Sequence, residues 1–224
     1  KALLAHFETV NHRPDVRVLV LTANTAGQPQ PVFCAGYDIG GFDASGQGAS
    51  FFEEIPVALA ALRPVTICAL NGSVYGGATD MVLACDFTVA QHGMSWRMPA
   101  VALGLHYYPS GLRRYVSRMG LQMSKRAFLL GQSMPYETLD QLGMFEALVE
   151  ADTFEATIQN LVAQLCQMAP SALASTKQSL NEIAAGLYNE PALKERSRQS
   201  VHSQDFNEGR AAFAQRRAPK FTGT

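Results

Sequence analysis

The stretch NGSVYGGATDMVLACDFTVA (residues 71–90) decides the fold class of this chain. The apolar segment VTICAL (65–70) precedes it and predicts a buried strand, which the Asn-Gly pair at the start of the quoted stretch ends with a turn. The Gly-Gly pair at 76–77 then opens a helix of small residues, and residues 86–90 predict another strand. This alternation of strand and helix indicates an α/β protein.

The glycine pair is also a candidate binding feature. The first N–H groups of a helix have no partner within it and lie at its positive end, so Gly77 N–H can stabilise negative charge that develops on an oxygen. A second outward N–H, that of Tyr37, is expected where the short strand 32–34 runs into Ala-Gly. The glycine pair would equally serve close packing of helix on strand, so the local pattern leaves both interpretations open.

The rest of the chain divides into a mixed half and a helical half. Before the quoted stretch we expect a helix over 1–12, a strand over 16–22, a loop rich in Gly and Asp over 36–50 and a helix over 51–62. After Pro109 the pattern is mostly helical. The predicted helices there are residues 110–119, 124–130, 136–142, 152–168, 171–186, 193–203 and 207–215. An α/β core with a helical extension follows, without an independent second domain.

The composition narrows the class of function. The chain has 224 residues, 47% of them hydrophobic, and a net charge of -1. A chain of this kind folds into a globular core, and it lacks the positive charge that binding to nucleic acid or an acidic membrane needs. No apolar run approaches the ~18 residues of a membrane span. The four cysteines are far apart and have no metal-ligand spacing, so we expect free thiols, no metal site and a cytoplasmic location.

The segment FCAGYDI (33–39), about forty residues before the quoted stretch, adds a second motif. Together the two motifs resemble the crotonase superfamily, the enoyl-CoA hydratase/isomerase family. Further resemblances follow in the family's order at residues 16–23, 63–72, 98–105, 136–149 and 208–221. The match covers almost the whole chain. It implies a crotonase-like spiral of ββα units over 1–142. Residues 143–224 would then form a C-terminal strand and a helical trimerisation region, and the family's N-terminal strands and CoA-contacting turn would precede residue 1.

The resemblance implies an acyl-CoA thioester as substrate, no cofactor beyond coenzyme A itself, and a homotrimer or a dimer of trimers. It assigns the backbone N–H groups of Tyr37 and Gly77 to an oxyanion hole for the thioester carbonyl. It also implies that Ala35, Asp38 and Ile39 border the adenine–pantetheine channel. Losing one donor of an oxyanion hole costs on the order of 3 kcal/mol, so these two amides would carry much of any catalysis.

The sequence departs from the family at its two catalytic glutamates. The corresponding positions hold Asp80, one methylene shorter, and Ala100, which cannot exchange a proton. Between residues 56 and 136 the only acids are Asp80 and Asp86, and we expect Asp86 to be a structural hydrogen-bond acceptor. Asp80 therefore remains the candidate catalytic acid, and addition of water by two carboxylates is doubtful.

The aromatic run His-Tyr-Tyr at 106–108 lies where the family varies its catalytic groups. The pattern LG-x-x-Tyr, ending at Tyr107, is similar to methylmalonyl-CoA decarboxylase, and a tyrosine O–H could orient a carboxylate so that CO2 leaves. The same aromatic residues could instead be packing and pocket wall. The leading hypothesis is thus a hydratase/isomerase-family enzyme. The alternatives are a decarboxylase of the methylmalonyl-CoA type and an inactive CoA-binding protein.

Overall fold

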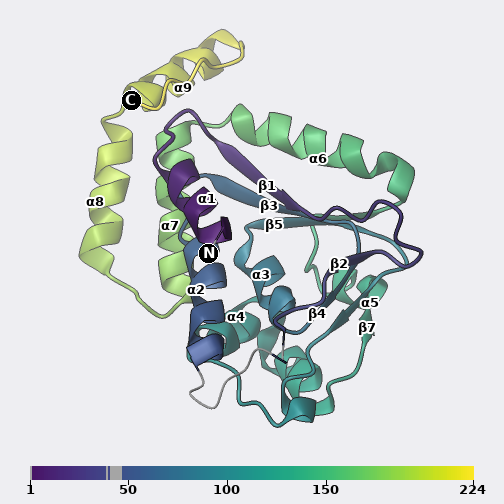
Figure 1. Cartoon of the computed structure of the whole chain (residues 1–224). Coiled ribbons are helices and arrows are strands. Elements are labelled where there is room, and N and C mark those ends of the chain that lie inside the picture. Colours follow the sequence, from purple (N-terminus) through teal and green to yellow (C-terminus); the bar gives the residue numbers. More distant parts are fainter. Residues whose placement is uncertain (1, 39, 41–46) are drawn as a thin grey trace.

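The computed structural model describes residues 2–38, 40 and 47–224 and contains two four-stranded sheets (Figure 1). The first sheet is parallel throughout and has the order β1-β3-β5-β8. Its strands are β1 (Val18–Thr22), β3 (Val65–Leu70), β5 (Phe87–Gln91) and β8 (Ala147–Val149). The second sheet has the order β2-β4-β6-β7, with only the last pair antiparallel. Its strands are β2 (Val32–Cys34), β4 (Ser73–Tyr75), β6 (Ser95–Arg97) and β7 (Met134–Pro135).

A repeating unit builds both sheets at once. Each unit adds one strand to the first sheet, the next strand to the second sheet, and then a helix. The helices that close the three successive units are α2 (Gln47–Ala60), α3 (Gly77–Ala84) and α4 (Pro109–Lys125). This is the spiral of ββα units that the sequence predicts, and the α/β fold class is confirmed.

The first sheet is covered on both faces because its central strand is apolar on both. β3 is buried along its whole length. Val65, Ile67 and Ala69 pack with apolar residues of α6 (Ala151–Cys166), whereas Cys68 and Leu70 belong to the larger core on the side of α2 to α4. Side chains two residues apart along a strand share a face, which explains this division. Figure 1 shows α6 lying across the sheet opposite α3.

The C-terminal helices extend the core. The third helix from the end, α7 (Pro170–Ala184), is fastened to it by the buried Lys177, whose Nζ lies 2.7 Å from Asp86 Oδ2 and donates to Pro64 O. Asp86 also accepts hydrogen bonds from the backbone N–H and the hydroxyl of Thr66, which confirms its structural role. Beyond α7, α8 (Glu190–Val201) and α9 (Gln204–Gln215) reach away from the sheets (Figure 1). The remaining helical segments are α1 (Ala2–Asn11), 3-10 helix Val101–Leu103, π-helix Arg126–Leu130 and α5 (Tyr136–Asp140).

Two details of the sequence prediction are wrong. The helix α2 begins at Gln47, so residues 47–50 are helical and not part of the predicted loop. The short strands β4, β6 and β7 are absent from the prediction, because each includes Ser, Arg or Pro and is too short to display an alternating pattern. The equally short β2 consists of Val, Phe and Cys and was predicted. The predicted break after residue 119 does exist inside α4, where Gly120 has a φ of 72°.

Candidate active site

The two backbone segments named as oxyanion donors meet at one edge of the second sheet. β2 and β4 are parallel neighbours, so Gly36 after β2 and Gly77 after β4 leave their strands at the same edge. A Cβ built on Gly36 would lie 2.8 Å from Tyr75 O and 3.3 Å from Gly77 N. Gly36 also has a φ of 93°. Only glycine permits both this conformation and this close approach.

These segments line a cavity of about 390 Å³. Tyr37, Gly76 and Gly77 form one part of its wall, and Ala100 and Tyr107 another. The other lining residues are Ala35, Phe52, Glu53, Met98, Pro99, Leu103, Leu105, His106 and Tyr108. Gly77 is the first residue of α3, and within the described part of the chain no side chain caps this helix start. The positive end of α3 therefore faces a mostly apolar cavity, where a partial charge acts strongly.

The ring of Phe52 covers the glycine at the start of α3. A Cβ built on Gly77 would lie 2.5 Å from the Phe52 ring, so this position too has room only for hydrogen. The same ring lies edge-on to Tyr37 at a centroid distance of 6.0 Å, and 6.5 Å from the ring of Tyr108. Phe52 thus supplies an apolar wall beside the candidate oxyanion donors.

A hydrogen-bonded chain runs from the cavity into the core. Tyr107 donates to the hydroxyl of Tyr108 at 2.8 Å, and Tyr108 donates to Asp80 Oδ2 at 2.6 Å. Arg114 Nη1 lies 2.6 Å from both carboxylate oxygens of Asp80. Since both partners of Asp80 are donors, the geometry is that of a carboxylate.

Burial has the largest effect on the pKa values of the acid and the two tyrosines in this hydrogen-bonded series. Asp80 is fully buried, and desolvation raises its pKa above the usual value although Arg114 and Tyr108 act in the opposite direction. The pKa values of Tyr107 and Tyr108 are raised far above the ordinary one, first by burial and then by the charge of Asp80. Both tyrosines are therefore neutral hydroxyls at physiological pH.

The structure brings some of the predicted site residues together and leaves others apart. Tyr37, Gly77, Tyr107 and Ala35 line the cavity. Asp80 does not line it but lies behind Tyr108. The exposed Asp38 uses its carboxylate to accept a hydrogen bond from Gly40 N–H. Ile39, the third residue predicted to border the coenzyme channel, falls outside the described residues.

The sequence reasoning missed one carboxylate of the cavity wall, that of Glu53 on α2. The hydroxyl of Ser110, near the start of α4, donates to Glu53 Oε1 at 2.5 Å. Glu53 stands three positions before the stretch from 56 to 136, in which Asp80 and Asp86 are the only acids. Its place in the predicted helix over 51–62, directly after the glycine-rich segment, was the signal that could have found it.

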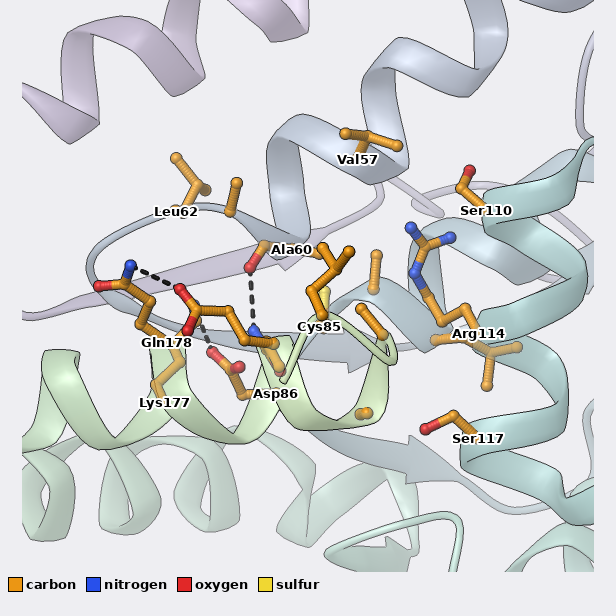
Figure 2. Close-up of a pocket in the computed structure, with 18 of the residues that line it drawn as sticks. Val57, Ala60, Leu62, Cys85, Asp86, Ser110, Arg114, Ser117, Lys177 and Gln178 are labelled. Carbon is orange, nitrogen blue, oxygen red and sulfur yellow. Dashed lines mark hydrogen bonds and ion pairs between the residues drawn. The ribbon is translucent and has the colours of Figure 1, made fainter. Parts of the chain in front are cut away.

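A second cavity, of about 730 Å³, lies on the other side of the hydrogen-bonded chain. Figure 2 shows Ser110 and Arg114 of α4 on one side of it and Val57 and Ala60 of α2 across from them. Lys177 of α7 lies on the far side, beside Asp86 (Figure 2). Ser110 and Arg114 line this second cavity, and each also contacts an acid outside it. Ser110 donates to Glu53, which lines the first cavity, and Arg114 donates to the buried Asp80.

The part of the chain that the structure describes contains neither a candidate metal site nor a candidate membrane-spanning helix. None of the His, Cys, Asp and Glu side chains described there form a group of three or more that could hold a metal ion. The helices of the same residues include none that is long and apolar enough to cross a bilayer.

The chain is similar in sequence and in structure to known proteins of one family. The family model for enoyl-CoA hydratase/isomerase matches residues 1–224. An enoyl-CoA isomerase/hydratase of Mycosarcoma maydis is 30% identical over 94% of this chain and 78% of its own length. A methylmalonyl-CoA decarboxylase of Escherichia coli is 25% identical over 95% of this chain and 83% of its own length. The crystal structure of an enoyl-CoA hydratase from Bacillus anthracis shares the fold, with a TM-score of 0.87, 23% identity, and coverage of 100% of this chain and 88% of that one.

Proposed function

The chain belongs to the enoyl-CoA hydratase/isomerase family, and we propose that it is an enzyme that binds an acyl-CoA thioester and stabilises its enolate. The observation that carries the proposal is the contact between the two glycine segments. Gly36 lies so close to Tyr75 and Gly77 that the N–H groups of Tyr37 and Gly77 belong to one small region of the cavity wall. Two such amides are what a thioester oxyanion requires.

In this proposal the protein acts mainly through fixed charge and exclusion of water. The N–H groups of Tyr37 and Gly77 hold the thioester oxygen, and the positive end of α3 adds to the stabilisation as charge develops. Phe52 and the other apolar lining residues keep water from screening that charge. Ala35, Asp38 and Ile39 would border the coenzyme, and no cofactor other than the coenzyme A of the substrate is proposed.

The residues favour an enolate reaction over the addition of water. Ala100 lines the cavity and offers no proton, and Asp80 is held behind Tyr108 by Arg114. A hydratase or isomerase remains the leading proposal, with isomerisation the better fit to the side chains. The alternatives are a decarboxylase of the methylmalonyl-CoA type, favoured by Tyr107 in the cavity wall and by the relative from Escherichia coli, and an inactive CoA-binding protein.

The purified protein should bind acyl-CoA thioesters but hydrate crotonyl-CoA only slowly. The physical reason is that water addition needs an acid and a base near the same double bond, whereas the two family positions hold Asp80 and Ala100. Hydration is followed through the thioester absorbance, and CO2 release from methylmalonyl-CoA is measured separately. Fast hydration would show that the loss of the second glutamate does not disable this chemistry. Binding without turnover on a broad thioester panel would support the inactive alternative.

Tyr107→Phe should lower thioester turnover by no more than about tenfold, because a neutral hydrogen bond contributes only about 1 kcal/mol. The Tyr107 hydroxyl donates its hydrogen to Tyr108, so that hydrogen is already engaged within the protein. The measurement compares the variant with wild type on each thioester. A loss beyond about 100-fold that is confined to methylmalonyl-CoA would instead favour the decarboxylase, since only that reaction needs the tyrosine to orient a carboxylate.

A homotrimer or a dimer of trimers is proposed as the assembly. Large apolar side chains of the C-terminal region are exposed, among them Leu180 and Leu187 at more than 60% and Phe213 at 88%. Apolar surface of this extent is typical of an interface between subunits.

A further inference from the structure

Glu53 is a carboxylate in the wall of the same cavity as the candidate oxyanion donors. Resting on the proposed function, we propose that Glu53 is the acid–base residue of this site, the group that exchanges a proton with the carbon skeleton of the thioester. The family's own glutamate positions do not supply such a group here. The assignment therefore moves this role from α3 and the segment around Ala100 to α2.

The local structure holds Glu53 in place. Its helix packs beside α3, and its sequence neighbour Phe52 lies directly over Gly77. Glu53 therefore lines the same cavity as Tyr37 and Gly77 although it is distant from both in the sequence. Ser110 donates to Oε1 and thereby fixes the carboxylate. We assign the other oxygen, Oε2, to the reacting carbon. The Ser110 hydroxyl occupies one lone pair of Oε1 and orients the carboxylate, and it leaves the lone pairs of Oε2 available to accept a proton.

The other acid of the region is unsuited to this role. Asp80 is fully buried and contributes nothing to the cavity wall, and Arg114 lies within 2.6 Å of both of its oxygens. Tyr108 stands between Asp80 and the cavity. Proton exchange through Asp80 would need both neutral tyrosines or the arginine to move away, whereas Glu53 reaches the cavity directly.

One base in this position suits a 1,3-proton shift. The Glu53 carboxylate takes a proton from the α-carbon of a 3-enoyl thioester, and the electron pair moves into the carbonyl, whose oxygen is held by the two amides. The protonated Glu53 then returns the proton to the γ-carbon, and the electrons move back so that the double bond becomes α,β. Bonds and charge balance without water, oxidant or reductant, and Glu53 ends as the carboxylate.

The decisive variant is Glu53→Gln, which preserves shape but removes the base. With cis-3-hexenoyl-CoA as substrate, we expect the rate of double-bond migration to fall at least about 100-fold. Exchange of the α-hydrogen with D2O should fall in parallel, and the dissociation constant of the thioester should change little. Glu54→Gln is the matched control, because Glu54 is the exposed neighbour on the same helix and lines neither cavity. Glu53→Asp should restore part of the activity.

The outcomes separate this inference from the proposed function. If wild type neither binds nor converts any thioester, the proposed function is wrong. If wild type migrates the double bond and Glu53→Gln does so equally well, only the assignment of Glu53 is wrong. If wild type binds thioesters but shows neither turnover nor exchange at the α-carbon, the enolate activity and the assignment of Glu53 are both wrong, and the inactive alternative is supported.

Discussion

Gly36→Ala is expected to lower the turnover of an acyl-CoA thioester by about 100- to 1,000-fold, the effect of losing one oxyanion donor. The new methyl group would lie 2.8 Å from Tyr75 O and 3.3 Å from Gly77 N. Both neighbours are backbone atoms that cannot turn aside, so the two segments must separate. The N–H groups of Tyr37 and Gly77 then no longer converge on one oxygen. The measurement is kcat/KM on the best thioester of the panel.

The matched control is Gly27→Ala. Gly27 also has a positive φ, of 76°, but a Cβ there would meet nothing within 4 Å. Both substitutions carry the backbone strain of a positive φ, about 1–2 kcal/mol, whereas only Gly36→Ala crowds the site. Equal losses of activity in the two variants, or no loss in Gly36→Ala, would mean that the contact between the segments does not set the position of the donors.

Much of the fold could be predicted because its signals are local. β3 was predicted at its observed bounds, since five apolar residues and one threonine between a Pro and an Asn-Gly turn permit little else. In the second sheet, β2 was predicted at its observed bounds, whereas β4, β6 and β7 escaped prediction for the opposite reason. β4 and β6 have three residues each, and their pairing depends on the parallel neighbours that the spiral brings alongside. Tertiary context, and not propensity, forms them.

The candidate site was predicted where backbone defines it and only partly where side chains do. The glycines at 36 and 77 indicate in the sequence itself that two backbone segments can approach each other closely, and the structure shows that approach. Asp80 looked like a catalytic acid because of its offset from the glycines, yet its direction depends on Arg114, thirty-four residues later. Glu53 belongs to no motif, and only its place directly after the glycine-rich segment points to it. A pairing between side chains from different helices leaves no periodic trace in the sequence.

Arg114→Met is expected to destabilise the protein by about 3–5 kcal/mol, the usual cost of leaving one member of a buried ion pair without its partner. Asp80 is fully buried, and the Arg114 side chain is only 13% exposed. Methionine keeps the length of the aliphatic stem but leaves the carboxylate with the hydrogen bond from Tyr108 and without a positive charge beside it. Equilibrium denaturation measures the free energy of unfolding. Arg113→Met, at the exposed adjacent position, is the control and should change it by no more than about 0.5 kcal/mol.

The double variant Asp80→Asn with Arg114→Met tests whether the uncompensated charge is the cause. Asparagine can still accept the Tyr108 hydrogen bond, so we expect most of the lost stability to return.

The pH dependence of the free energy of unfolding gives an independent check with a definite sign. Burial already raises the pKa of Asp80 in the folded protein, and removing Arg114 raises it further. A raised carboxyl pKa means that the folded state binds the proton more tightly than the unfolded state, so stability falls as pH rises through the folded-state pKa. The cost of Arg114→Met should therefore be smallest near pH 4 and grow toward neutral pH. If Arg114→Met loses the same free energy of unfolding near pH 4 and at neutral pH, then lost packing of the arginine stem, and not the isolated charge of Asp80, destabilises the variant.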